Sequence, residues 1–163
     1  MKINKSSGTA LITGAAKRIG HEIALTLASL GYEIVIHYNH SKKEALELSK
    51  KITKKYQIKT SLVAADLSNK NEIKKLADFM VNNFANWNLL INNASTFDKS
   101  KLLDFNDQNL FDNINIHLVA PLFLSQAFAK NVKQKRIQDS QIINLIDKNI
   151  TRIETSYFYY LLS

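Results

Sequence analysis

Short apolar runs alternate with segments of helical periodicity along almost the whole chain, and this alternation constrains the fold more than any other feature. The apolar runs are continuous and rich in β-branched residues, which is typical of strands that helices cover on both faces. The predicted strands are residues 9–13, 33–38, 60–65, 88–92 and 141–146. This order predicts an α/β fold of the Rossmann type, with a doubly wound parallel sheet.

The segments between the predicted strands carry helix signals. With their caps, the predicted helices cover about residues 19–30, 41–56, 68–84, 107–134 and 153–163. Ser41 followed by Glu44 predicts a capping box at the start of the second helix, and Ser68 predicts the cap of the third. Pro121 is expected to interrupt or kink the long fourth helix, because proline removes a backbone donor.

Composition excludes several classes of protein. The length of 163 residues and the hydrophobic content of 45% predict one globular domain, residues 1–163. The sequence has no apolar run long enough for a membrane span and no signal-peptide pattern at its start. Cysteine is absent, which excludes disulfides and thiol chemistry and fits a reducing compartment, so we expect a cytoplasmic location.

The net charge of +8 raises the question of an anionic partner. The lysines, however, occur as pairs along the predicted helices, which favours solvated helix faces over a nucleic-acid or membrane surface. The sequence has no zinc-finger spacing, no RNA-binding aromatic motif and no arginine cluster. We therefore expect no nucleic-acid partner, no membrane partner and no metal site.

In a parallel sheet of this kind, ligands lie beyond the carboxyl ends of the strands. The first predicted strand is followed by TGAAKRIG, residues 13–20, in which Gly14 allows a tight turn and Gly20 allows close packing at the start of a helix. The free N–H groups of a helix start can bind a phosphate. With two glycines the motif is a weak dinucleotide fingerprint, and an ordinary turn is the alternative, but Lys17 and Arg18 suit a highly charged ligand.

The residues after the second predicted strand indicate which nicotinamide cofactor would fit. NAD-binding folds usually place an Asp or Glu here to bind the ribose 2′-hydroxyl. This chain has Asn39, His40 and Ser41 instead. Neutral donors without a carboxylate leave room for a 2′-phosphate and favour NADPH, although the same residues could simply start the next helix.

Two further strand ends carry polar or small residues. Asp66 follows the third strand and could accept a hydrogen bond from an adenine amino group, although Asp is also a common loop residue. The small residues of NNAS, residues 92–95, would let a cofactor approach the backbone after the fourth strand.

The segments TGAAKRIG, HYNHS, ADLS and NNAS, in this order, resemble the short-chain dehydrogenase/reductases. More narrowly they resemble the pteridine reductase branch, which includes dihydrofolate/dihydromonapterin reductase-type enzymes. That branch shares Arg18 in place of glycine, NNAS in place of NNAG, and His-Tyr after the second strand. The resemblance covers the chain from about Thr9 onward, and the ordered set is specific although each motif alone is not.

The resemblance implies a role for each matching residue. A pyrophosphate loop would consist of Gly14, Lys17, Arg18, Ile19 and Gly20. The 2′-phosphate would be held by Asn39, His40 and Ser41, the adenine framed by Asp66 and Leu67, and the nicotinamide ribose flanked by Asn93, Ala94 and Ser95. Phe97 would stack on a flat pterin, with Tyr157 beside the substrate; plain packing is the alternative for Phe97.

Two positions depart from the wider family. His117 stands where most members carry an Asn, so a relay role and a structural role both remain open, and Asn115 is expected on a different helix face. Asp147 stands where the wider family has a catalytic Ser, which agrees with the pteridine reductase branch. An Asp beside the catalytic tyrosine could supply or relay a proton to a pterin ring nitrogen.

The family's catalytic pair is Tyr-x-x-x-Lys, and the spacing from Asp147 makes Tyr160 the matching tyrosine. The lysine would be residue 164, beyond the 163 residues of the sequence. The resemblance therefore implies a piece of a longer enzyme, or of a split or decayed gene, that lacks two strands and the substrate loop. We expect weak or no turnover from residues 1–163 alone, and residues 141–146 at an exposed sheet edge.

The expected function of the whole enzyme is hydride transfer from NADPH to a dihydropterin or dihydrofolate, with Tyr160 and Asp147 handling protons. A complete chain is expected to form a homo-oligomer, since family members commonly dimerise through their long helices. The alternatives are a reductase of 3-oxoacyl or sugar substrates, a non-catalytic relic or partner subunit, and a basic nucleic-acid-binding protein.

Overall fold

The computed structural model describes residues 7–104, 106–147 and 156–163. Five strands form one parallel sheet in the order β3-β2-β1-β4-β5. The strands are β1 (Thr9–Ile12), β2 (Glu33–Tyr38), β3 (Thr60–Ala64), β4 (Trp87–Asn92) and β5 (Gln141–Asn144). The chain starts in the middle of the sheet, builds outward to β3 and then crosses to β4, which confirms the predicted doubly wound fold.

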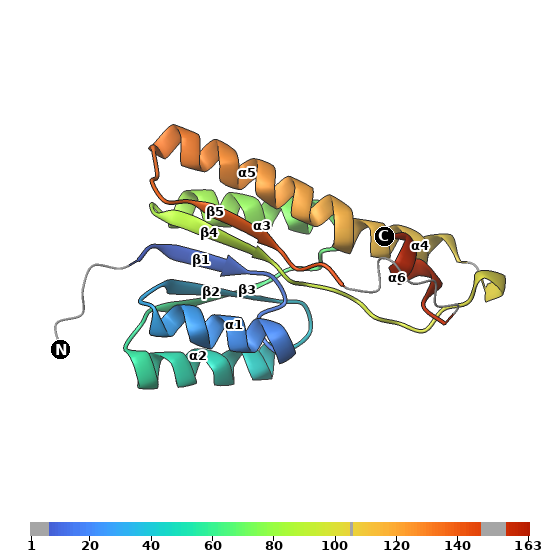
Figure 1. Ribbon diagram of the computed structural model, residues 1–163, viewed down its shortest axis with the longest axis horizontal. Helices are drawn as coiled ribbons and strands as arrows, with labels where there is room; N and C mark the ends of the chain where they lie inside the picture. Colours follow the sequence, from blue (N-terminus) through green and yellow to red (C-terminus); the bar gives the residue numbers. More distant parts are fainter. Residues whose placement is uncertain (1–6, 105, 148–155) are drawn as a thin grey trace.

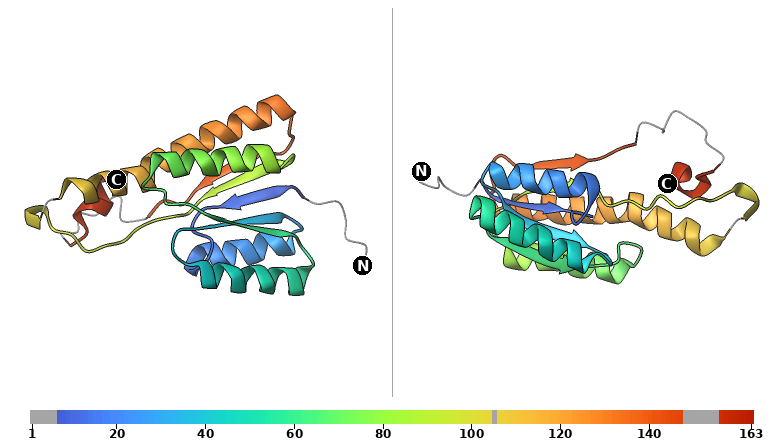
Figure 2. Two further views of the ribbon diagram at one scale, coloured as in Figure 1. Left: turned by 180° about the vertical axis from the view of Figure 1, so that it is seen from behind. Right: turned by 90° about the horizontal axis from the view of Figure 1, so that it is seen from below.

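Helices cover both faces of the sheet (Figure 1). One face carries α1 (Arg18–Ser29) and α2 (Lys42–Tyr56), and the other carries α3 (Lys70–Asn83) and α5 (Ala120–Lys135). Past the carboxyl ends of the strands, α4 (Asp107–Ile114) packs against α6 (Phe158–Leu162). The short helix η1 (Leu102–Asp104) precedes α4, and both views of Figure 2 show this part projecting from the end of the sheet.

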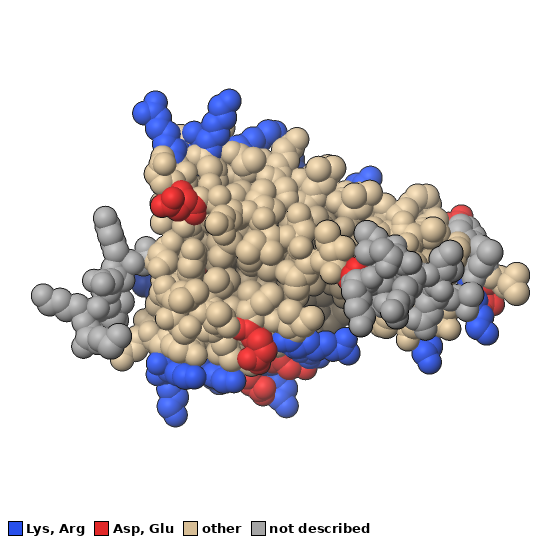
Figure 3. All heavy atoms as spheres, in the orientation of Figure 1, with Lys and Arg blue, Asp and Glu red and all other residues tan. Residues whose placement is uncertain are grey.

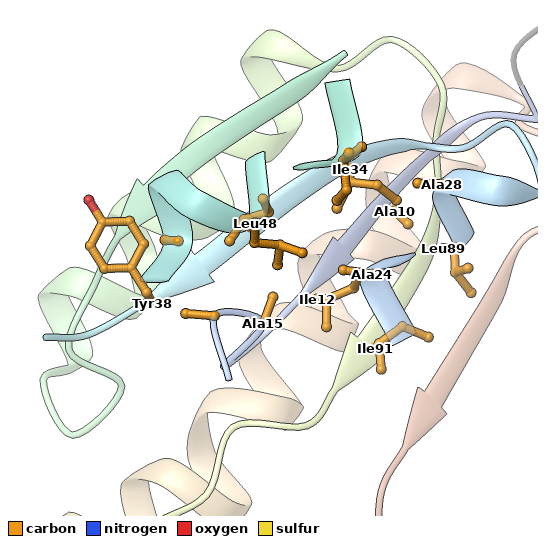
Figure 4. Packing of buried hydrophobic residues seen from close by; sticks show 14 residues of the cluster. Ala10, Ile12, Ala15, Ala24, Ala28, Ile34, Tyr38, Leu48, Leu89 and Ile91 are labelled. Atoms are coloured by element: carbon orange, nitrogen blue, oxygen red, sulfur yellow. The ribbon is translucent and has the colours of Figure 1, made fainter. Parts of the chain in front are cut away.

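The continuous apolar strands fill two cores because neighbouring residues point to opposite faces. Ile12 packs with Ile34 and Leu48 between the sheet and the α1/α2 layer (Figure 4). Leu11 belongs to the opposite core, where the ring centroids of Trp87 and Phe128 lie 5.0 Å apart in an edge-to-face arrangement. No helix among the described residues has the length and apolar character that crossing a membrane requires.

The predicted capping box at the start of α2 is wrong. Ser41 is the N-cap residue, but within the described structure its side chain makes no capping hydrogen bond. Glu44 pairs with Lys17, whose Nζ lies 2.8 Å from its carboxylate. The Glu44 carboxylate therefore pairs with a nearby cation instead of bonding to the Ser41 backbone N–H, as the capping box requires.

The predicted cap of α3 is wrong by one residue. The N-cap is Asn69, whose side-chain oxygen accepts a hydrogen bond from the Asn71 N–H at 2.9 Å. Ser68 lies in the preceding loop, where its hydroxyl donates to Asp66 at 2.8 Å. A carboxylate acceptor two residues away thus draws the serine out of the capping position.

The long helix predicted over residues 107–134 is interrupted before Pro121, as expected. The interruption is a π-helical turn, η2 (Asn115–Val119), in which the Ala120 N–H bonds to the Asn115 carbonyl. Pro121 has no N–H to give to the carbonyl of His117, and its ring crowds that carbonyl, so the ordinary helical ladder cannot continue there. Such π-turns are frequent at functional sites.

The last helix begins later than predicted, at Phe158, and residues 148–155 lie outside the described residues. Tyr157 precedes the helix as its N-cap residue and forms an isolated bridge with Ser100. Its carbonyl accepts a hydrogen bond from the Leu161 N–H at 3.1 Å, so Tyr157 lies at the start of the turn that carries Tyr160. Tyr159 is the buried anchor, with its hydroxyl bonded to the Asp104 carbonyl at 3.0 Å.

Candidate cofactor groove and active site

A groove of about 1420 Å³ is lined by the residues that follow the strands, together with parts of η2, α5 and α6. Sixteen of the seventeen residues predicted from the sequence as site residues line it: Gly14, Lys17, Arg18, Ile19, Gly20, Asn39, His40, Ser41, Asp66, Leu67, Asn93, Ala94, Ser95, Phe97, Asp147 and Tyr160. The seventeenth, Tyr157, reaches the same region through its contact with Phe97. Segments far apart in the chain thus converge on one groove.

The turn between β1 and α1 depends on its two glycines. Gly14 has φ +64, and a Cβ there would lie 2.9 Å from the Cα of Ala94. A Cβ on Gly20 would lie 2.5 Å from the Gly14 carbonyl oxygen. The turn therefore needs both glycines to pack against the end of β4, whatever the groove binds. Arg18 opens α1 with φ 52, a left-handed conformation that is uncommon for residues other than glycine.

Asn93 and Thr13 hold this turn against the end of β4. The Asn93 side-chain amide donates to the Thr13 carbonyl at 2.8 Å and to the Gly14 carbonyl at 3.2 Å. The Thr13 hydroxyl oxygen accepts from the backbone N–H groups of Asn93 and Ala94 at 2.9 and 3.0 Å. Asn93 thus braces the turn. Sequence reasoning missed Thr13, because a threonine that ends an apolar strand gives no local signal of such a role.

His37 is a second residue that sequence reasoning left without a role. Its Nδ1 accepts a hydrogen bond from the Gly14 N–H at 3.0 Å, and its Nε2 lies 3.0 Å from the Ala65 carbonyl. A backbone N–H can only donate, so the proton of the neutral ring is assigned to Nε2. Burial lowers the pKa of His37 to about 4, and the neutral ring links the turn after β1 to the end of β3.

The end of the groove near α2 is suited to an anionic group. Lys17 and Arg18 line it together with Ser41, whose hydroxyl makes no capping bond within the described residues. Lys17 is held by Glu44, and its hydrogen bond keeps the pKa of that carboxyl below the usual value. Asp66 also lines the groove, and one of its carboxylate oxygens accepts from the Ser68 N–H at 2.9 Å and from the Ser68 hydroxyl at 2.8 Å.

The opposite end of the groove is aromatic. The rings of Phe97 and Tyr157 stack with centroids 4.0 Å apart and an interplanar angle of 16°. The Tyr160 ring meets Phe97 edge-on at 4.8 Å. The Tyr160 hydroxyl donates to the Asp147 carboxylate at 2.9 Å. Burial, reinforced by this carboxylate, raises the pKa of Tyr160 to about 12, so the phenol keeps its proton at neutral pH.

His117 lies in η2, beside the end of β4. Its Nε2 lies 3.0 Å from the Ser95 hydroxyl and accepts from the Thr96 N–H at 3.2 Å, and its Nδ1 lies 2.6 Å from the Ser163 hydroxyl. Burial lowers the pKa of His117. Asn115, as expected from its helix face, points elsewhere and donates to the Ser68 carbonyl at 2.8 Å.

Among solved structures, this fold is similar to FolM alternative dihydrofolate reductase 1 from Brucella suis in complex with NADP. The TM-score is 0.84 at 28% identity, and the match covers 95% of this chain and 63% of that one. The sequence is 27% identical over 195 residues to pteridine reductase 1 from Leishmania tarentolae, covering 98% of this chain and 68% of that protein.

A third relative acts on a different substrate. The 3-oxoacyl-[acyl-carrier-protein] reductase FabG of Staphylococcus aureus (strain Mu50 / ATCC 700699) is 30% identical over 145 residues, covering 89% of this chain. This chain spans 56% of the length of FabG, about half. The family profile described as short chain dehydrogenase matches residues 8–150. The chain therefore belongs to the short-chain dehydrogenase family.

Proposed function

We propose that this chain carries the NADPH-binding and proton-donating residues of a reductase that acts on a dihydropterin or dihydrofolate. The observation that carries the proposal is the Tyr160–Asp147 hydrogen bond beside the exposed ring of Phe97, at one end of the groove. Lys17, Arg18 and the start of α2, where the Ser41 side chain makes no capping hydrogen bond within the described residues, lie at the other end. This arrangement matches a ligand with phosphates at one end and a reacting ring at the other.

Three features of the groove support NADPH as the cofactor. Lys17 and Arg18 supply positive charge, and Ser41 has a hydroxyl that does not cap its own helix within the described structure. Residues 39–41 contain no carboxylate to repel a 2′-phosphate. When bound, NADPH supplies a hydride. The structure of the similar FolM protein is a complex with NADP.

The aromatic end of the groove suits a flat heterocycle. Phe97 is 48% exposed, and one of its faces already accepts a second ring, that of Tyr157, in a nearly parallel stack. A pterin ring could stack in the same way and gain from both area burial and ring geometry. Tyr160 stands edge-on to Phe97, so its hydroxyl would approach the rim of a ring stacked there.

The proton chemistry follows from the Tyr160–Asp147 pair. Because its pKa is raised to about 12, Tyr160 is a protonated phenol throughout the neutral range. A ring nitrogen becomes strongly basic as an adjacent carbon accepts hydride, so it can draw the proton from a weak acid held within reach. Asp147 orients the phenol and supplies a route by which a proton can return from solvent, since the pair is partly open to water.

The similarity to FabG makes a 3-oxoacyl substrate the second candidate. Asp147 disfavours it. A carboxylate bonded to Tyr160 strengthens the hold of the phenol on its proton, and it would repel the oxyanion that forms when a ketone accepts hydride. A ring nitrogen that becomes neutral on protonation is a better acceptor in this setting.

The first test is equilibrium binding of NADPH and NADH to this chain. We expect NADPH to bind about tenfold more tightly, and Ser41→Ala to remove most of that preference, because a hydrogen bond to a charged group contributes roughly 1.5–3 kcal/mol, which is about tenfold or more in affinity. Ser49→Ala, on the same helix but bonded to Thr60, is the matched control. Equal affinity for both cofactors would contradict the NADPH assignment.

The second test addresses the substrate, with the whole protein. NADPH oxidation would be followed with a dihydropterin, dihydrofolate and a 3-oxoacyl thioester. We expect turnover with the first two, and Asp147→Ser to lower that turnover by about tenfold or more, as for loss of a group in a proton route. Faster reduction of the thioester than of either pteridine would overturn the substrate assignment and leave the cofactor assignment standing.

A further inference from the structure

His117 contacts both sides of the candidate site. On the cofactor side, its Nε2 accepts from the Thr96 N–H at 3.2 Å and lies 3.0 Å from the Ser95 hydroxyl. On the proton-donor side, its Nδ1 lies 2.6 Å from the hydroxyl of Ser163, which in turn donates to the Tyr160 carbonyl at 3.3 Å. One imidazole therefore connects the segment after β4 to the end of α6.

The ring also packs directly against the proposed proton donor. The centroids of His117 and Tyr160 lie 5.3 Å apart, with the rings at 86° to each other. One turn before His117, the Asn113 side-chain oxygen accepts from the Thr96 hydroxyl at 3.2 Å. The helix that ends in the π-turn thus holds residue 96 at two points, of which the one at His117 can titrate.

The contacts define the protonation state in which this link exists. The Thr96 N–H can only donate, so Nε2 must carry a lone pair, and the neutral ring has its proton on Nδ1, facing Ser163. A proton added to Nε2 would point at the Thr96 N–H and end that hydrogen bond. The link between the two sides of the site is therefore a property of the neutral histidine.

We propose that His117 is a proton-sensitive positioning residue that clamps the Ser95–Thr96 segment to the helix bearing Tyr160 while its ring is neutral and releases the segment when the ring is protonated. The clamp rests on the contacts alone. Its consequence for the reaction rests on the proposed function, because Ser95 and Thr96 line the part of the groove assigned to the nicotinamide end of the cofactor.

The surroundings of the ring agree with this assignment. Burial lowers the pKa of His117, which favours the neutral form at physiological pH. The groups that face the ring from the end of β4 are the uncharged Ser95 and Thr96, with Asn113 behind them. From α6 and its C-cap they are Tyr160, whose pKa is raised to about 12, and Ser163. The nearest charged group named by these contacts is the Asp147 carboxylate, which accepts from the Tyr160 hydroxyl.

The test is hydrogen exchange at the Thr96 amide, read by NMR as a protection factor at about pH 7.5 and about pH 5. In the unaltered chain we expect the Thr96 amide to be protected at the higher pH. At the lower pH its protection factor should fall by about tenfold, which corresponds to the loss of one hydrogen bond. His117→Asn keeps an acceptor and should protect Thr96 equally at both pH values. His117→Ala should leave it unprotected at both.

Two controls keep the proposal falsifiable. His21→Asn removes a histidine on α1 that bonds to Glu22, outside the contacts of the clamp, and should leave the pH dependence unchanged. His117→Asn is close in size and uncharged, so it separates the clamp from a general loss of folding. Protection in His117→Ala equal to that of the unaltered chain, or pH dependence retained in His117→Asn, would overturn the proposal.

NADPH binding, measured in parallel, separates this proposal from the proposed function. If the clamp holds Ser95 and Thr96 in place for the cofactor, the affinity of the unaltered chain for NADPH should fall by about tenfold from about pH 7.5 to about pH 5. In His117→Asn the change should be several-fold smaller. The same change in both proteins would overturn the link to the cofactor. Absence of NADPH binding at either pH would contradict the proposed function, while the exchange at Thr96 would still decide the clamp.

Discussion

The neighbouring strands β4 and β5 have similar apolar sequences and very different surroundings. Every residue of β4, WNLLIN, is buried, whereas every residue of β5, QIIN, is exposed. Ile91 and Ile143 are paired in register, yet Ile91 is 2% exposed and Ile143 is 44% exposed. The apolar character of a strand therefore does not by itself bury it; burial depends on what lies on its two faces and two edges.

The difference comes from the layers around each strand. β4 has β1 on one side and β5 on the other, with a core on each face. β5 has one neighbouring strand among the described residues. Ile143 of this strand, and Leu145 just after it, line a groove of about 770 Å³ beside α1. On the face of the molecule in Figure 3, Lys and Arg lie mainly along the upper and lower margins and leave a largely uncharged middle.

The paired residues Ile91 and Ile143 give the sharpest test of the difference in burial between β4 and β5. Ile91→Ala should lower the free energy of unfolding by roughly 2–5 kcal/mol, because it opens a cavity in a packed core. Ile143→Ala removes the same atoms from a half-open surface and should cost less than about 1 kcal/mol. Urea unfolding of the two variants, followed by circular dichroism, measures both values.

Two further results decide how that experiment is interpreted. Similar costs for the two variants would mean that β5 is as well packed in solution as β4, and the contrast would fail. The denaturant slope of both variants should match that of the unaltered chain, because a changed slope would signal a change in the surface exposed on unfolding rather than in packing alone.

Burial also makes the stability of the sheet depend on pH, because the titratable side chain of His37 lies in the part of the sheet that is buried on both faces. Its pKa falls from 6.5 to about 4 on folding, so the unfolded chain binds more protons than the folded one between these values. The contribution of His37 to the free energy of unfolding is therefore complete above about pH 6.5. It is lost as the pH drops toward 4, by roughly 3 kcal/mol in total. Urea unfolding at a series of pH values measures this loss.

The matched variant for this prediction is His37→Gln, whose amide can accept from Gly14 and donate to Ala65 without titrating. Other groups also contribute to acid destabilisation. The quantity to compare is therefore the difference in the free energy of unfolding between the unaltered chain and His37→Gln at each pH. That difference should narrow as the pH falls from 6.5 to 4. A difference that stays constant over this range would show that the His37 proton plays no part in stability.

The sequence predicted the sheet and its layers because both depend on patterns that one chain carries. Continuous β-branched runs such as residues 33–38 identify strands buried on both faces, and Pro121 predicted a break in the long helix. The errors lie at helix starts. Glu44 bonds to Lys17, and Ser68 bonds to Asp66, so partners from the loops override the local capping pattern.

In the candidate site, too, local patterns predicted the position of residues, but not the contacts between distant segments. Strand-end motifs located the residues that line the groove, since parallel strands bring their carboxyl ends to one edge. They did not reveal how those residues support one another. Thr13 bonds to Asn93, and His37 bonds to Gly14, across separations of 80 and 23 residues, and no local pattern records such contacts.

The smallest expected effect on stability is a charge at the edge of the sheet. An exposed apolar edge strand offers backbone groups and side chains to another chain. Ile143→Lys places a charge on that edge while removing little packing, so the free energy of unfolding should change by no more than about 0.5–1 kcal/mol. Self-association of this chain, followed by sedimentation velocity over a concentration series, should nevertheless decrease. Gln134→Lys, at an exposed position on the far end of α5, raises the net charge by the same amount and is the control. If Ile143→Lys associates as strongly as the unaltered chain, β5 is not the surface through which copies meet, and the exposed strand differs from β4 in packing alone.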